Sequence, residues 1–319
     1  MISIAMTSFN GEKYIEAQLK SFKTQTLLPD EVIICDDFSN DNTIEIVNRF
    51  KEDSPFKVLL SQNKEGLGIA KNFSKALDLC RGDYIFLSDQ DDVWFPKKLE
   101  SIINLSRKHK NKFVFYNNTE YCNSDLKPTG KFKIEQLEKY GLEFVQGCCA
   151  MVRKEILDLI VPIPSGIAHD SWIYEISKAF DIRFVHREPL QYYRIHQNNF
   201  SKFSFNKSLA TGNISLIKRI KRVSINKITS DLAEDSRKVD FLIKRFNEKK
   251  SLLPEHLLLD NFKEDRLLEQ KKANQDRIKN LKLSLVKKYF HVLFFFISGK
   301  YSDFYNGYRS FLKDFFLVH

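Results

Sequence analysis

The fold is decided by residues 84–94, Tyr84-Ile85-Phe86-Leu87-Ser88-Asp89-Gln90-Asp91-Asp92-Val93-Trp94. An apolar run begins after the turn residues Gly82-Asp83 and stops at three carboxylates. A short apolar run between turn residues predicts a buried strand. Ligand sites in open α/β sheets lie outside the carboxyl ends of the strands, so we expect the three carboxylates at the mouth of a site.

Three carboxylates this close together need an explanation. Asp89, Asp91 and Asp92 would repel one another unless a cation lay between them. Carboxylate oxygens suit Mg²⁺ or Mn²⁺, which keep positions open for water and for substrate phosphates. The functional interpretation is therefore a divalent metal that holds a diphosphate. The structural alternative is a solvated acidic turn that caps a helix beginning near Pro96.

The same pattern occurs earlier in the chain. Residues 31–35 predict a strand that ends on Asp36 and Asp37, and residues 2–6 and 56–60 predict two more strands. Helical patterns separate these strands, and this alternation predicts an α/β fold with a mostly parallel, doubly wound sheet. Because acids from two strands would then share one edge, the pattern favours a ligand site over a solvated turn.

No glycine motif for phosphate binding is present. Gly66-Leu67-Gly68 lacks the third glycine of a dinucleotide fingerprint and does not follow the first strand, and GxxxxGK[ST] is absent. We therefore expect a nucleotide to bind through carboxylates and a metal.

The chain beyond residue 100 is expected to complete the same domain. Strands are predicted at residues 113–116, 144–152, 182–186 and 190–196. Asn117 to Lys133 is polar and turn-rich, which indicates a loop over the sheet. A second loop, Pro162 to Ala168, leads to His169-Asp170-Ser171-Trp172, after which Ile173, Ile176 and Phe180 mark the face of a helix.

These motifs together resemble the family-two, GT-A-fold inverting glycosyltransferases that build bacterial surface polysaccharides. The Asp-Gln-Asp-Asp-x-Trp form is similar to the rhamnosyltransferase-like branch of that family. The similarity covers roughly residues 1–200, and Phe38 departs from it where the family usually has Gly. The matching segments are residues 7–15, 35–43 and 82–94, with Asn63, Gly66, Gly68 and Asn72 between them.

The resemblance implies roles for individual residues. The base of the nucleotide is expected at Asp37, and the turn after the first strand is expected to line base and ribose. Asp91, Asp89 and His196 are the expected ligands of Mn²⁺ or Mg²⁺, whereas the role of Asp92 stays open. The nucleotide-sugar-binding set is Thr7, Phe9, Asn10, Glu12, Asp37, Asn72, Asp89 and Gln90.

Two of these assignments have structural alternatives. Asp170 matches the general base of the family, since a carboxylate within reach can take the proton of an attacking hydroxyl. It could equally cap the helix that it begins. His196 could complete the metal shell or donate to the diphosphate, but a single histidine is often structural.

Charge divides the chain. Residues 1–200 hold 26 Lys and Arg against 28 Asp and Glu, and residues 201–319 hold 25 against 13. We expect a GT-A catalytic domain at 1–205 and a basic, aromatic, helical region at 206–319. The basic region suits the surface of a membrane, and the alternative is a helical subdomain that packs its aromatics internally.

The five cysteines form no CxxC pair, and Cys148-Cys149 is interpreted as packed thiols. Reduced cysteines, no signal-peptide pattern and no apolar run of about 20 residues predict a cytoplasmic enzyme, peripheral on the inner face of the membrane.

The sequence thus predicts a metal-dependent inverting glycosyltransferase. Its donor would be dTDP-rhamnose, UDP-galactose or UDP-glucose, its acceptor a growing surface glycan or a lipid-linked glycan, and it could form an oligomer. One alternative is a nucleotide-binding protein without turnover, whose basic tail binds nucleic acid or membrane. The charge division argues against a nucleic-acid groove near the acids. A glycosidase with two carboxylates is the third interpretation, and the metal-type cluster argues against it.

Overall fold

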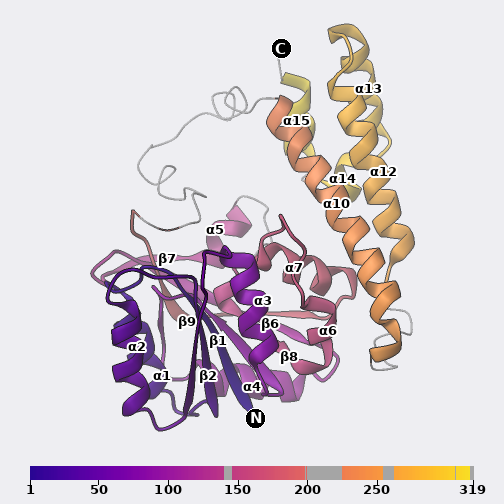
Figure 1. Cartoon of the computed structure of the whole chain (residues 1–319). Coiled ribbons are helices and arrows are strands. Elements are labelled where there is room, and N and C mark those ends of the chain that lie inside the picture. The colour runs from indigo at the N-terminus through magenta and orange to yellow at the C-terminus, as the bar shows by residue number, and fades with distance from the viewer. Residues whose placement is uncertain (140–145, 198, 200–224, 254–261, 306, 317–319) are drawn as a thin grey trace. The chain divides into compact units, whose positions relative to one another are not determined.

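The computed structural model describes residues 1–139, 146–197, 199, 225–253, 262–305 and 307–316 (Figure 1). Contacts divide the chain into two compact units. The first unit contains Met1–Gln197 and Arg245–Phe262, and the second contains Asn198–Lys244 and Lys263–His319. The boundary expected between residues 205 and 206 lies outside the described residues and stays a prediction.

One sheet organises the first unit. In the described residues its order is β3-β2-β1-β4-β8-β6-β9-β5, with β7 beside β6. The strands are β1 (Ile2–Ser8), β2 (Glu31–Asp36), β3 (Lys57–Gln62), β4 (Tyr84–Ser88), β5 (Val93–Trp94), β6 (Val114–Cys122), β7 (Pro128–Phe132), β8 (Ala150–Arg153) and β9 (Arg183–Arg194). The predicted α/β fold with a central sheet and a helical C-terminal region is confirmed.

The first four strands of the sheet are parallel, as the alternation predicts. Ser8 of β1 lies opposite Asp36 of β2, and Met6 of β1 lies opposite Ser88 of β4. The carboxyl ends of three neighbouring strands are thus level. This register brings Asp36 and Asp89 to one edge of the sheet, where the sequence pattern placed them.

Beyond β4 the sheet is mixed. β8 is antiparallel to both β4 and β6, and β6 pairs in parallel with β9. The two late strands predicted at 182–186 and 190–196 are one strand, because β9 stays paired with β6 through two register shifts. Its far end pairs with β5, which sets Tyr192 opposite Val93.

Two predictions in this half were wrong. The expected loop from Asn117 to Lys133 contains the end of β6 and all of β7. Asn118 fits the sheet because its buried amide is paired: it donates to Glu135 and to the Arg187 carbonyl. The strand expected at 144–152 is shorter, since Gly147–Cys149 forms a 3₁₀ turn before β8 and residues 140–145 lie outside the described part.

Helices cover the sheet as the apolar periodicity predicts. α1 (Ile15–Lys23) buries Ile15, Leu19 and Phe22 in the main core, and α3 (Ile69–Leu79) packs on β1 and β2. The remaining helices of the first unit that lie before residue 198 are α2 (Thr43–Glu52), α4 (Lys98–Lys108), α5 (Lys133–Lys139), α6 (Leu157–Ile160) and α7 (His169–Ala179).

The second unit is helical in its described residues. It contains most of α10 (Ile225–Lys249), together with α12 (Glu264–Leu281), α13 (Leu285–Ile297), α14 (Lys300–Phe304) and α15 (Tyr308–Phe316). A buried ion pair holds it together, because Asp314 accepts from Arg277 Nε at 2.6 Å and from the Tyr301 hydroxyl at 2.7 Å. Among the described helices, none has the length and hydropathy to span a membrane.

Candidate active site at the carboxyl edge of the sheet

The site is built around the connection from β4 to β5, which carries Asp89, Gln90, Asp91 and Asp92. Gln90 ties this connection to the turn after β1: its Oε1 accepts from the Phe9 N–H and its Nε2 donates to the Phe9 carbonyl, both at 2.9 Å. A Cβ on Gly11 would lie 2.2 Å from Gln90 Oε1, so a larger residue there would displace the Gln90 amide. Both ends of the Gln90 amide are thus hydrogen-bonded to the backbone of Phe9. The Phe9 side chain itself stays 54% exposed.

The turns after β1 and β2 are joined by their own polar groups. Asn10 adopts a left-handed φ of 46°, its N–H donates to Ser39 Oγ, and its Oδ1 accepts from the Asn40 N–H. Glu12 Oε2 accepts from the backbone and the side chain of Asn42 at 3.0 and 2.8 Å. These predicted nucleotide-binding residues lie side by side at the sheet edge, with Thr7 inside β1 just below them.

The two acids after β2 differ in their surroundings. Asp36 is buried and accepts from Ser8 Oγ and from the Ser39 N–H, so it fixes the two turns. Asp37 accepts from the N–H groups of Leu67 and Gly68 at 2.7 and 2.8 Å. Asp37 therefore positions the Gly66–Gly68 loop, and its predicted contact with a nucleotide base stays a prediction.

Asn72 is a structural residue in this arrangement. It is buried, its Nδ2 donates to the Cys35 carbonyl at 2.8 Å, and its Oδ1 accepts from Asn63 Nδ2 at 2.9 Å. Lys75 Nζ donates to Asn63 Oδ1 at 2.7 Å. The network ties α3 to the end of β2, and the predicted contact of Asn72 with a nucleotide sugar stays a prediction.

Asp91 and His196 meet at the sheet edge. His196 Nε2 lies 2.8 Å from Asp91 Oδ2, although 105 positions separate the two residues. The Tyr14 ring packs on the imidazole at a centroid distance of 4.5 Å. Arg194 binds the same connection, because its Nε donates to the Asp91 carbonyl at 2.8 Å. Two of the three predicted metal ligands are therefore in direct contact.

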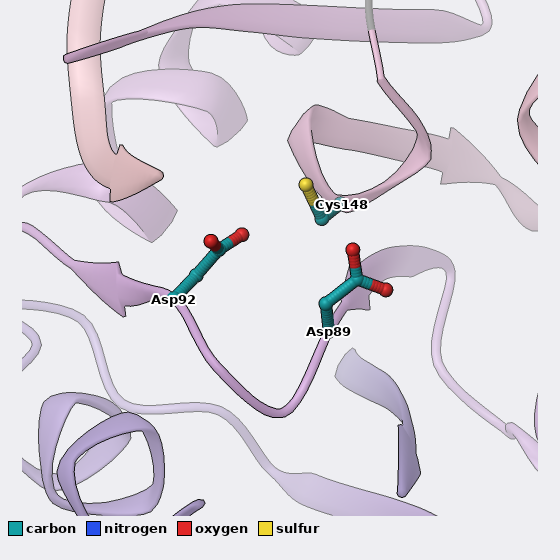
Figure 2. A group of neighbouring side chains, drawn as sticks. All are labelled: Asp89, Asp92 and Cys148. Carbon is teal, nitrogen blue, oxygen red and sulfur yellow. The ribbon is translucent and has the colours of Figure 1, made fainter. Parts of the chain in front are cut away.

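Asp89, Asp92 and Cys148 form a second group of donor atoms. One carboxylate oxygen from each acid and the Cys148 sulfur lie within 4.8 Å of one another. Figure 2 shows both carboxylates, from the two ends of the connection, on the side facing the Cys148 loop. Burial, and then the charge of Asp91, raises the pKa of Asp89 to about 7. The same causes raise the pKa of Asp92 well above its usual value.

The two acids suit different tasks. Asp92 is buried, and its oxygens already accept from Gln191 Nε2 at 2.8 Å and from the Arg194 N–H at 3.3 Å. Asp89 is partly exposed beside these groups. Oxygen and imidazole donors suit Mn²⁺ or Mg²⁺, whereas a thiolate favours softer metals. Asp89, Asp91 and His196 therefore stay the predicted ligands of Mn²⁺ or Mg²⁺, while Asp92 anchors the connection through its buried hydrogen bonds.

Sequence reasoning missed the support beneath these acids. Lys98 is completely buried, its Nζ donates to Gln191 Oε1 and to the Cys148 carbonyl, and the ammonium lies 3.9 Å from the Trp94 ring centroid. The Nε2 of the same Gln191 amide donates to Asp92 Oδ2, so Lys98 and Asp92 are linked through Gln191. Burial lowers the pKa of Lys98 to about 8. The sequence pattern does not mark Lys98 as buried. Its contact with Gln191 becomes visible only in the structure, where β5 pairs with β9 and brings residue 191 close to Lys98 and Asp92.

Asp170 lies in the first turn of α7. Its Oδ1 accepts from the Ser171 N–H at 2.7 Å, and its charge contributes to the raised pKa of Asp89. The 3₁₀ turn at Gly147 lies against the start of α7, because a Cβ on Gly147 would lie 2.5 Å from His169 Nε2 and 3.1 Å from Asp170 Cβ. His169 itself stacks on Phe73 at 4.0 Å, and burial lowers its pKa. His169 is thus a packing residue, whereas its sequence context suggested a local hydrogen-bond partner.

Residues 3–160 match the sequence profile of Glycosyl transferase family 2. This is the family that the motifs resemble. The chain carries a family 2 glycosyltransferase domain. The dTDP-rhamnosyl transferase RfbG of Shigella flexneri is 29% identical over 255 residues, which are 72% of this chain and 86% of that protein.

The name of a second relative includes a lipid-linked substrate. The UDP-Glc:alpha-D-GlcNAc-diphosphoundecaprenol beta-1,3-glucosyltransferase WfaP of Escherichia coli is 27% identical over 219 residues, covering 67% of this chain and 85% of that protein.

Solved structures agree on the fold. S. aureus TarS in complex with UDP-GlcNAc has a TM-score of 0.54 at 15% identity, over 97% of this chain and 90% of the TarS chain. The mannosyltransferase PcManGT from Pyrobaculum calidifontis, in complex with GDP-Man and Mn²⁺, has a TM-score of 0.53 at 14% identity, over 98% and 85%.

Proposed function

We propose that this glycosyltransferase moves a sugar from a nucleotide-diphospho-sugar to a hydroxyl of a lipid-linked surface glycan, with inversion at the anomeric carbon. The observation that carries the proposal is the contact of Asp91 with His196 beside Asp89, at the edge where the carboxyl ends of β1, β2 and β4 meet. The relatives support the donor class, since one is named for dTDP-rhamnose and another for UDP-glucose.

The donor would lie along the turns after β1 and β2. The exposed Phe9 ring offers a face for a base, and the Asn10 and Glu12 turns border it. Asp89, Asp91 and His196 would hold Mn²⁺ or Mg²⁺, which neutralises the charge that develops on the leaving diphosphate. Stabilising such developing charge usually lowers the barrier more than any other single effect in an enzyme.

Asp170 would act as the general base. Its carboxylate takes the proton of the acceptor hydroxyl, and the oxygen attacks the anomeric carbon opposite the diphosphate. The new C–O bond forms as the bond to the nucleoside diphosphate breaks, and the leaving group keeps the electron pair. One displacement inverts the configuration without a covalent enzyme intermediate.

The acceptor would place the enzyme at a membrane. The name of WfaP contains diphosphoundecaprenol, a lipid carrier. A related acceptor would hold this enzyme at the surface of a membrane. We therefore also propose a peripheral membrane location.

The proposal is tested by release of nucleoside diphosphate from a panel of dTDP and UDP sugars, with Mn²⁺, Mg²⁺ or EDTA. We expect one donor to be turned over only with metal, and Asp91→Ala to lower the rate at least a hundredfold. Asp78→Ala, which removes an exposed acid on α3, is the matched control and should leave the rate unchanged. If no donor bound or reacted with metal and a lipid-linked acceptor present, the proposal would be wrong.

A further inference from the structure

An apolar stripe is exposed on α13. Val292 and Phe295 turn inward and pack with Tyr301 in a buried cluster, so one face of the helix is already used by the fold. The stripe lies on the other face, because its members are spaced i, i+3, i+4 and i+7. Its four side chains are Phe290, Leu293, Phe294 and Ile297, which are 73%, 45%, 66% and 75% exposed.

A stripe of this kind indicates an interaction surface. Single exposed apolar residues are common, but contiguous apolar patches mark protein or membrane contact sites. The helix has 13 residues, which is shorter than the ~20 that a spanning helix needs. A short helix that is apolar on its outer face suits the boundary between head groups and acyl chains, where it lies in the plane of the membrane.

The charged residues in the sequence of α13 and its flanks have one sign. Between residues 278 and 302 the sequence has no Asp or Glu. Lys287 is exposed on α13, one turn before Phe290, and Lys282 is exposed just before the helix. Such cations attract anionic head groups and act within a Debye length of the surface. The lysines of this segment are Lys279, Lys282, Lys287, Lys288 and Lys300.

We propose that the α13 stripe inserts into the surface of an anionic lipid bilayer, with Lys282 and Lys287 over the head groups. The proposal deepens the proposed function and rests on it in one respect: a lipid-linked acceptor would lie in the same bilayer. The rings and aliphatic side chains supply the apolar contact, and the lysines select for negative charge. A second copy of the chain is the competing occupant of this face.

The test is sedimentation of the full chain with vesicles of phosphatidylcholine alone or mixed with phosphatidylglycerol. We expect binding to the anionic vesicles and weaker binding in high salt. Phe290→Ser combined with Phe294→Ser should lower the partition coefficient roughly a hundredfold, at about tenfold for each ring removed. Lys287→Glu should weaken binding to anionic vesicles more than to neutral ones.

The matched control is Phe241→Ser, which removes a 39% exposed ring from α10 and should bind as the parent does. Unchanged sedimentation of the double variant would overturn the proposal. The proposal would also be overturned if the parent chain did not bind vesicles but formed a dimer, and if the double variant were a monomer in light scattering. Sedimentation needs neither donor nor metal, and donor hydrolysis needs no vesicles, so failure here and failure of the transferase function are separately visible.

Discussion

At the scale of single residues, Asp89 couples stability to pH. Its pKa is raised to about 7, chiefly by burial and by the charge of Asp91. Between about pH 4 and 7 the folded carboxyl keeps a proton that the unfolded chain has lost, so the free energy of unfolding falls as the pH rises through this window. At pH 8 the Asp89 carboxylate is charged in the folded state, and the cost of burying that charge lowers the free energy of unfolding in full.

Asp89→Asn is therefore expected to stabilise the metal-free protein at pH 8 while it lowers transferase activity. We expect a gain of at least about 1 kcal/mol, which is roughly 2–4 °C in melting temperature, and little gain at pH 4. Thermal unfolding at the two pH values with EDTA measures it. An equal effect of the variant at both pH values would contradict the assignment of the raised pKa to Asp89.

Lys98 is expected to position the acids without touching substrate. Its ammonium reaches Gln191, whose amide holds Asp92, so Lys98→Met removes the support of the β4–β5 connection. We expect kcat to fall at least tenfold and the Mn²⁺ concentration for half-maximal activity to rise. Stability should change by only about 1 kcal/mol, since an apolar side chain avoids the cost of a buried charge.

Lys97→Met is the matched control for Lys98, because Lys97 is exposed at the adjacent position. Metal titrations of activity and melting curves for both variants separate positioning from folding. A normal Mn²⁺ titration of Lys98→Met would count against the positioning role.

At the scale of elements, the sequence predicts those helices and strands whose pattern of apolar and polar residues is visible within a short stretch. The period of apolar residues in α1 and the acids after β2 and β4 needed no tertiary information. Pairing between distant strands was not predictable: β7 forms because β6 offers it an edge, although Pro128 and Gly130 make its sequence resemble a turn. The contact of Asp91 with His196 was expected only from the family resemblance, since 105 positions separate them.

The 3₁₀ turn at Gly147 supplies an element-scale prediction. A Cβ at this position would lie 2.5 Å from His169 Nε2 and 3.1 Å from Asp170 Cβ, so Gly147→Ala must push the first turn of α7 outward. We expect kcat to fall at least tenfold with a nearly unchanged KM for the donor, because the proposed base Asp170 moves and the turns proposed to bind the donor do not. Steady-state kinetics measures both constants.

Gly130→Ala on β7 is the control for this substitution. Gly130 has a φ of 65° and open space around it, so alanine there costs about 1–2 kcal/mol of strain without touching the site. If Gly130→Ala lowered kcat as much as Gly147→Ala does, general destabilisation would explain both results, and the positional argument would be wrong.

At the scale of the whole molecule, each buried cluster of the described residues belongs to one unit, so we expect a defect in one unit to leave the chemistry of the other unchanged. Asp314→Ala leaves the Arg277 guanidinium buried without its carboxylate, which is expected to cost the second unit about 3–5 kcal/mol. Asp240→Ala removes the exposed partner of Lys271 in the same unit and should cost at most about 1 kcal/mol.

Calorimetry with parallel donor hydrolysis measures this prediction. For Asp314→Ala we expect an unfolding transition at lower temperature, while metal-dependent release of nucleoside diphosphate keeps its rate below that transition. Vesicle binding through α13 should be lost together with the second unit, since the stripe depends on the packing of Val292 and Phe295. A loss of hydrolysis in step with the early transition would mean that the catalytic unit needs the helical unit to fold.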